Sequence, residues 1–168
     1  YGIGSLLEGG ANDKKGELRQ AEEAFRHLTT LPEKVPQANG WTNMARVYFA
    51  DGRLDLATAA LNKAREADAP WWVLAWFNGL VHAENATEKE HFERAIEDFE
   101  KILDPDLQPA ERKFDFTRDY IVRTRLGQTL YQRAQMEAEG SPEQRVWLTR
   151  AAKEFYRVLR DESEDLES

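Results

Sequence analysis

Residues 41–64 read WTNMARVYFADGRLDLATAALNKA, and the spacing of their small and large apolar residues is that of helices. In the second half of this stretch, Ala57, Leu61 and Ala64 recur at intervals of four and three residues, which places them on one face of a helix. The alanines allow a neighbouring helix to come close, and the leucine fills the space beside them. We therefore expect two consecutive helices, over residues 40–51 and 54–67, packed as an antiparallel pair.

The same spacing recurs three more times along the chain. In each case an alanine stands four residues before a large apolar residue, and the pairs are Ala21 with Phe25, Ala95 with Phe99, and Ala151 with Phe155. Upstream of each alanine lies a second helical segment with a small residue in its middle. Together these segments predict eight helices in four pairs, near residues 1–9, 17–31, 40–51, 54–67, 70–84, 88–103, 115–138 and 142–160.

Residues that start and stop helices support these boundaries. Residues 87–90 and 141–144 fit capping boxes, in which a Ser or Thr side chain and a later Glu or Gln satisfy the first backbone amides of a helix. Gly9-Gly10 and Gly16 flank a polar segment and are expected in turns. Residues 104–113 contain two prolines and predict an irregular connection.

The composition fits one globular domain and limits the classes of ligand. A chain of 168 residues with 41% hydrophobic residues can bury a core, so residues 1–168 are expected to form a single domain. The net charge of -8 argues against nucleic-acid binding, which needs a basic surface. No apolar run approaches the roughly 20 residues that cross a bilayer, so we expect no membrane insertion. The chain has no cysteine, which excludes thiolate metal ligands and covalent haem attachment within it.

Several chemically active side chains are better explained as structure. His82 and His91 lack the i, i+4 spacing of metal ligands on one helix face, so no metal site is predicted. Adjacent carboxylates such as Glu22 and Glu23 point in different directions on a helix and do not converge as acid–base catalysis requires. The aromatic cluster within residues 71–77 either fills a seam between helix pairs or projects into a groove. The sequence predicts no enzyme activity and no cofactor.

The repeated pattern resembles that of the tetratricopeptide repeat, which has Trp, Leu-Gly and Tyr on its first helix and Ala, Phe and Ala on its second. The segment 41–64 carries this pattern almost whole, through Trp41, Met44, Ala45, Tyr48, Gly52, Ala57, Leu61 and Ala64. The resemblance implies an all-α fold, a right-handed α-α superhelix (TPR-like solenoid) of about four helix pairs. The repeats would span approximately residues 1–32, 39–69, 70–104 and 115–160, and three of them are degenerate.

In such a stack the first helix of each pair lines a concave groove. Aligning the small central residues places eleven side chains on that groove: Thr42, Asn43, Arg46, Phe49, Trp76, Phe77, Leu80, Thr124, Arg125, Gln128 and Tyr131. The resemblance implies a non-catalytic scaffold whose partner is a protein, a peptide or another domain of the same chain. The alternative is a structural spacer that positions other domains of a parent protein without a ligand in the groove.

Some members of this family bind an acidic chain terminus through Lys and Asn residues on successive first helices. Here Asn43 matches one of these positions, but Tyr1 and Ser5 stand where Lys and Asn are needed. Phe77 stands where Lys or Arg is needed. The departure argues against binding of chaperone tails, and the mixed aromatic and polar groove fits an extended peptide or a neighbouring domain better.

A second resemblance concerns the parent protein. Residues 1–9, 114–120 and 126–130 look like the tetratricopeptide regions of bacterial proteins that also carry a multihaem cytochrome c-like part. In that family the repeats follow the haem region, which implies an exported, periplasmic parent; without the resemblance a cytoplasmic location is equally compatible. The chain begins at Tyr1 without an initiator methionine and ends in the acidic run 161–168, so we expect a fragment of a longer protein.

Overall fold

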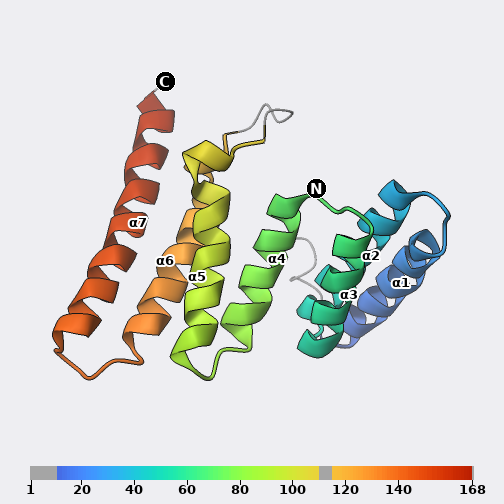
Figure 1. The fold of residues 1–168 in the computed structure, drawn as a ribbon, viewed down its shortest axis with the longest axis horizontal. Coiled ribbons are helices and arrows are strands. Elements are labelled where there is room, and N and C mark those ends of the chain that lie inside the picture. The colour runs from blue at the N-terminus through green and yellow to red at the C-terminus, as the bar shows by residue number, and fades with distance from the viewer. Residues whose placement is uncertain (1–10, 110–114, 168) are drawn as a thin grey trace. The chain divides into compact units, whose positions relative to one another are not determined.

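The structure, a computed structural model, describes residues 11–109 and 115–167, with side chains over 14–109 and 115–160. These residues form seven α-helices and two short 3-10 turns, and no strand occurs among them (Figure 1). The helices are α1 (Ala11–Thr29), α2 (Lys34–Ala50), α3 (Leu54–Glu66), α4 (Trp71–Glu84), α5 (Lys89–Leu103), α6 (Tyr120–Ala134) and α7 (Pro142–Glu167), and the 3-10 turns are η2 (Pro105–Leu107) and η3 (Phe116–Arg118). The predicted all-α class is confirmed.

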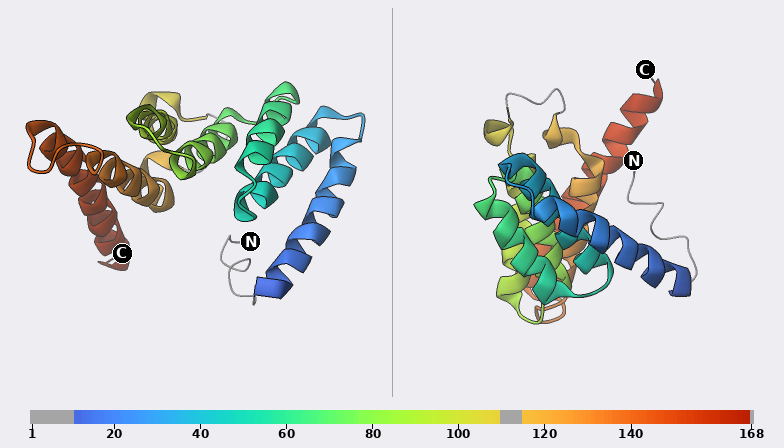
Figure 2. Two further views of the ribbon diagram at one scale, coloured as in Figure 1. Left: turned by 90° about the horizontal axis from the view of Figure 1, so that it is seen from below. Right: turned by 90° about the vertical axis from the view of Figure 1, so that its right-hand side faces the viewer.

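The chain divides into two compact units, residues 1–77 and 78–168, and the boundary lies within α4. In the first unit α1 packs on α2 and α2 packs on α3. In the second unit α5 packs on α6 and α6 packs on α7, as Figures 1 and 2 show from three directions. Helices that follow one another in the sequence therefore pack as neighbours, consistent with a tetratricopeptide-like helical stack. The superhelix and the single domain concern both units together and stay predictions.

The core of the first unit confirms the spacing within residues 41–64. Ala57, Leu61 and Ala64 of α3 are fully buried. On α2, Met44 and Ala45 are 2% and 1% exposed. Small residues beside a large one thus form the seam of the α2–α3 pair, as the pattern predicts.

The turn between α2 and α3 depends on Gly52. Its φ of 73° lies in the left-handed region, which glycine adopts without the steric cost of a Cβ atom. The amide of Gly52 donates to the carbonyl of Phe49 at 3.0 Å, and the amide of Arg53 donates to the carbonyl of Tyr48 at 2.8 Å. These two bonds form a Schellman motif, which satisfies the last carbonyls of α2 and ends the helix.

In the second unit, two glycines make room for aromatic rings. A Cβ atom on Gly79 of α4 would lie 2.6 Å from the Phe99 ring of α5. A Cβ atom on Gly127 of α6 would lie 2.8 Å from the Phe155 ring of α7. The two glycines are the small central residues, and the two phenylalanines the large residues, that the sequence pattern selected. The same contact is therefore used twice to hold one helix close to the next.

One end of the second unit is held by a buried arginine. Arg133 of α6 is 5% exposed, and its guanidinium donates to Glu93 of α5 at 2.7 Å and to Glu137 at 2.6 Å. It also lies 4.7 Å from the centre of a Trp147 ring on α7, and Arg150 lies 4.6 Å from that ring. Because a buried charge is costly unless it is paired, these contacts couple α5, α6 and α7 to one another.

Two of the predicted boundaries in the first unit are wrong. Helix α1 already covers residues 11–16, so Gly16 lies inside a helix and not in a turn. A single glycine destabilises a helix by about 1 kcal/mol relative to alanine. The helix still forms here because the neighbouring Lys and Glu residues have high helix propensity. Helix α2 begins at Lys34 instead of residue 40, because Pro36 falls in its first turn, where no backbone N–H is required.

The predicted helix over 115–138 is also shorter than expected, because two aspartates start two separate elements. The Asp115 carboxylate accepts from the amide of Thr117 at 2.9 Å and opens η3. The Asp119 carboxylate accepts from the amide of Ile121 at 2.9 Å and opens α6. Helix α6 then ends at Ala134, whereas α7 continues to Glu167, past the expected end at residue 160.

The two predicted capping boxes have different outcomes. At the start of α7, the amide of Gln144 donates to the Ser141 hydroxyl oxygen at 3.1 Å, which confirms the serine half of that box. The Gln144 side chain accepts from the amide of Gly140 at 2.8 Å instead of from that of Ser141. Helix α5 begins after Glu88, so the box at residues 87–90 is wrong. There the amide of Thr87 donates to Nδ1 of His91 at 3.3 Å. The predicted helix over residues 1–9 and the turn at Gly9-Gly10 lie outside the described residues.

The glycine–aromatic contact makes a testable prediction. We expect Gly79→Ala to lower the free energy of unfolding by about 1–3 kcal/mol, because the added methyl group overlaps the fully buried Phe99 ring. The measurement is urea denaturation followed by circular dichroism.

Gly16→Ala is the matched control for this substitution. Nothing lies within 4 Å of a Cβ atom at Gly16, so the same change inside α1 should stabilise the chain by about 0.5–1 kcal/mol. Equal effects of the two substitutions would contradict the packing at Gly79.

Candidate partner-binding faces

One face of α2 carries four of the predicted groove residues. Thr42 and Asn43 lie four and three residues before Arg46, and Phe49 lies three residues after it, so the four share one face; all are partly exposed. The Asn43 amide donates to the carbonyl one turn earlier in the same helix, at 2.8 Å. Within the described part of the chain, no carboxylate forms an ion pair with Arg46. Its positive charge is therefore available to a ligand on this face.

The three predicted groove residues of α4 differ in their exposure. Trp76 is partly exposed, whereas Phe77 and Leu80 are buried, at 9% and 8% exposure. Two further tryptophans, Trp71 and Trp72, stack edge to face with ring centres 5.9 Å apart. Phe77 and Leu80 thus belong to the core and supply little surface to a partner.

The predicted groove residues of α6 also share one face of their helix. Thr124 and Arg125 are partly exposed, Gln128 is exposed, and Tyr131 is 51% exposed. Arg125 differs from the arginine on α2, because its guanidinium lies 3.3 Å from the carboxylate of Glu84. Its charge is already partly neutralised within the second unit.

Two neighbours on the α6 face were missed by sequence analysis. Tyr120 is 56% exposed and Ile121 is 50% exposed, although both are large and apolar. Large apolar residues near the start of a helix are usually expected in the core. Their intervals from Thr124 and Gln128 place them on the same exposed face, and this signal could have identified them.

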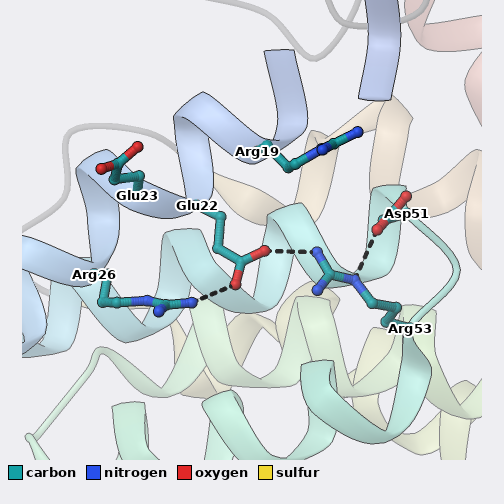
Figure 3. Close-up of a pocket in the computed structure, with 6 residues that line it drawn as sticks. All are labelled: Arg19, Glu22, Glu23, Arg26, Asp51 and Arg53. Atoms are coloured by element: carbon teal, nitrogen blue, oxygen red, sulfur yellow. Dashed lines mark hydrogen bonds and ion pairs between the residues drawn. The ribbon is translucent and has the colours of Figure 1, made fainter. Parts of the chain in front are cut away.

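Sequence analysis also missed a charged cluster between α1 and the α2–α3 turn. The Glu22 carboxylate accepts from Arg26 at 2.7 Å and from Arg53 at 2.8 Å, as Figure 3 shows. The Tyr48 hydroxyl donates to the same carboxylate at 3.3 Å, and Arg53 also pairs with Asp51 at 2.7 Å. The charged side chains of this cluster line an open pocket of about 650 Å³ together with Arg19 and Glu23.

The charges of this cluster offset one another, so we interpret it as a structural contact. The hydrogen bond from Arg53 lowers the pKa of Glu22 below its ordinary value of 4.5, and the bond from Arg26 adds to this effect. Burial raises the pKa of Tyr48, and the negative charge of Glu22 raises it further. Glu22 therefore stays ionised and fastens α1 to the turn that follows α2.

Neither histidine of α4 and α5 is part of a described metal site. His82 is paired through Nδ1 with the Asp98 carboxylate at 3.1 Å, and its side chain is 37% exposed. His91 accepts from a backbone amide at the start of α5. Over the described residues, no group of three or more His, Asp or Glu side chains is placed to hold a metal ion.

The helix pairs, with their small central residues and large partners, define a helical-repeat architecture. Residues 38–69, which contain most of α2 and all of α3, match the family model of the tetratricopeptide repeat. No curated protein and no solved structure gives a significant match to the chain. The matched repeat indicates a protein-interaction scaffold in general, and its family is generally non-catalytic. In the part of the chain that the structure describes, no helix is both long and apolar enough to span a membrane.

The Glu22 cluster predicts a pH-dependent contribution to stability. We expect Glu22→Gln to lower the free energy of unfolding by about 1 kcal/mol at neutral pH, because charge-assisted bonds from Arg26 and Arg53 are weakened. The folded pKa of Glu22 is lowered, so its contribution is complete above its ordinary pKa and is lost as the pH falls through the folded value.

Urea denaturation of the parent chain and the variant at neutral and acidic pH measures this effect, and the difference between them should shrink in acid. Glu23→Gln is the matched control, because Glu23 is exposed and points away from the ion pairs in Figure 3. A loss of stability in Glu23→Gln as large as that in Glu22→Gln would refute the assignment.

Proposed function

We propose that the chain is a protein-binding scaffold that holds extended peptide or protein segments on two separate faces, the exposed face of α2 in the first unit and the exposed face of α6 in the second. These are the first helices of their pairs, the elements that line the binding surface in tetratricopeptide stacks. The family match at residues 38–69 supports binding of a protein in general. We propose no catalytic step.

The observation that carries this proposal is the composition of the α6 face. Tyr120, Ile121 and Tyr131 each expose half or more of their surface on one side of a helix whose other side is buried. Aromatic side chains dominate the energetics of protein interfaces, because they bury large areas and lose little conformational entropy. Thr124 and Gln128 stand between them and offer hydrogen bonds to the backbone of an extended segment.

The charge of the α2 face suggests the chemistry of the bound segment. Arg46 is flanked by Thr42 and Phe49 and has no ion-pair partner among the described residues. A guanidinium of this kind binds a carboxylate through two parallel hydrogen bonds. We therefore propose that a segment bound on the α2 face carries acidic side chains for Arg46 together with apolar ones for Phe49.

A selection from a library of random dodecapeptides displayed on phage tests this proposal. We expect the chain to enrich peptides that combine Asp or Glu with aliphatic or aromatic residues. Arg46→Glu should weaken binding of peptides that contact α2, and Tyr131→Ala should weaken binding of peptides that contact α6. Each loss should be roughly tenfold, which corresponds to about 1.4 kcal/mol. Isothermal titration with the selected peptides measures it.

Lys63→Glu on α3 and Arg94→Glu on α5 are matched controls, because they reverse a charge at exposed positions on second helices. Both should bind the selected peptides with unchanged affinity. The proposal would be contradicted if the selected peptides bound the two face variants, Arg46→Glu and Tyr131→Ala, as tightly as they bind the two controls.

A second candidate is a structural spacer, and the ion pair of Arg125 favours it. A groove arginine that already contacts Glu84 leaves less of its charge for a ligand. Under this alternative the helix pairs would position other domains of a longer protein, such as the multihaem region that the sequence resemblance implies. Failure of the library to enrich any peptide would favour the spacer.

A further inference from the structure

A second pocket opens in the second unit, where the end of α5 lies beside α6 and α7. Its volume is about 250 Å³. Leu103 of α5 and Leu126 of α6 supply its apolar lining, and the other described residues that line it are charged. Drug-sized ligands occupy pockets of roughly 300–1,000 Å³, so a ligand that fits here is a smaller molecule.

The α6–α7 side of the pocket carries more positive than negative charge. The carboxylate of Glu154, which is 8% exposed, accepts from Arg123 of α6 and from Arg157 of α7, both at 2.7 Å. Two guanidinium groups therefore share one carboxylate, and neither forms another ion pair among the described residues. Arg123 also donates to the carbonyl of Thr117, but Arg157 has no hydrogen bond beyond that of its Nη1 within the described part of the chain. Its Nη2 and Nε groups are available to a second carboxylate, which a guanidinium holds through two parallel hydrogen bonds.

The α5 side of the pocket carries negative charge. Glu100 is paired with Arg150 of α7 at 2.7 Å, whereas Asp104 forms no ion pair among the described residues. Asp104 directly follows the last residue of α5, and the carbonyl groups at a helix C-terminus add a partial negative charge there. One oxygen of its carboxylate accepts from the amide of Asp106 at 2.9 Å, and the other has no donor in the described structure. This end of the pocket therefore favours a small cation with several N–H groups, such as a primary ammonium.

We propose that this pocket binds a free amino acid with an aliphatic side chain. The ligand carboxylate is held by Arg157, its ammonium by Asp104, and its side chain packs against Leu103. Such a ligand pairs the guanidinium excess on one side and the aspartate on the other at the same time. A ligand with a single charge would leave one of the two unpaired. A metal ion is not favoured, because over the described residues the carboxylates are not grouped as metal ligands.

The pocket is separate from the faces to which the proposed function assigns a peptide. By their spacing, Arg123 and Leu126 lie on a different side of α6 from Gln128 and Tyr131. A chain that fails to bind peptides can still bind the amino acid, and the reverse also holds. The two proposals therefore fail independently of each other.

Isothermal titration calorimetry of the 168-residue chain with L-leucine tests the proposal. We expect saturable binding at one site per chain. L-Leucinamide has no carboxylate and N-acetyl-L-leucine has no ammonium, so each analogue removes one of the two charged contacts. Both should bind roughly tenfold or more weakly than leucine, because each has lost the hydrogen bonds of one charged group.

Two substitutions assign the contacts to residues. Arg157→Gln should weaken binding of leucine roughly tenfold and leave that of leucinamide unchanged, because leucinamide has no carboxylate to lose a partner. Asp104→Asn should weaken binding of leucine by a similar factor and leave that of N-acetyl-leucine unchanged. Both variants should fold: Glu154 keeps its bond from Arg123 in the first, and asparagine keeps an oxygen for the amide of Asp106 in the second.

Lys153→Gln and Asp106→Asn are the matched controls, because each removes a charge at an exposed position outside the pocket. Both should bind leucine like the parent chain, and circular dichroism should show the same helix content in every variant. The proposal is overturned if leucine gives no saturable binding, or if the two analogues bind as tightly as leucine. It is also overturned if Arg157→Gln and Asp104→Asn bind leucine as tightly as the controls do.

Discussion

The close approach of a glycine on one helix to an aromatic ring on the next is the contact on which the helix packing depends. The ring of Phe99 packs against the backbone of Gly79, and the ring of Phe155 packs against the backbone of Gly127. In the first unit Gly40 of α2 plays a similar part, since a Cβ atom there would lie 2.9 Å from Leu28 of α1. A helix that approaches so closely buries its small residues and leaves its opposite side free. The exposed faces of α2 and α6 are a consequence of that packing.

The parts of the fold that follow from this contact could be predicted from the sequence. The spacing of Ala57, Leu61 and Ala64 identified a buried seam, and the spacing of Gly127 and Phe155 identified a helix pair. Helix starts were harder, because they depend on single side chains that compete with one another. Asp119 caps α6 at a point that the apolar pattern alone does not mark, and Pro36 is accepted in the first turn of α2.

The candidate faces were predictable in outline but not in their electrostatics. The helical period placed Arg46 and Arg125 on outward faces. It could not show that Arg125 reaches Glu84, whereas no described carboxylate pairs with Arg46. The cluster around Glu22 joins residues from α1, α2 and the following turn, and side chains so distant in sequence cannot be paired by spacing. Burial of Phe77 and Leu80 likewise depends on tertiary packing, which overrides their positions in the repeat.

The most direct test of this account is the nuclear Overhauser effect between the α-protons of the two glycines and the aromatic rings. We expect cross-peaks from Gly79 to the ring protons of Phe99 and from Gly127 to those of Phe155, because each ring lies against the backbone of its glycine. Folded, helical protein that gives neither set of cross-peaks would contradict the account, since the helices would then be held together by other contacts.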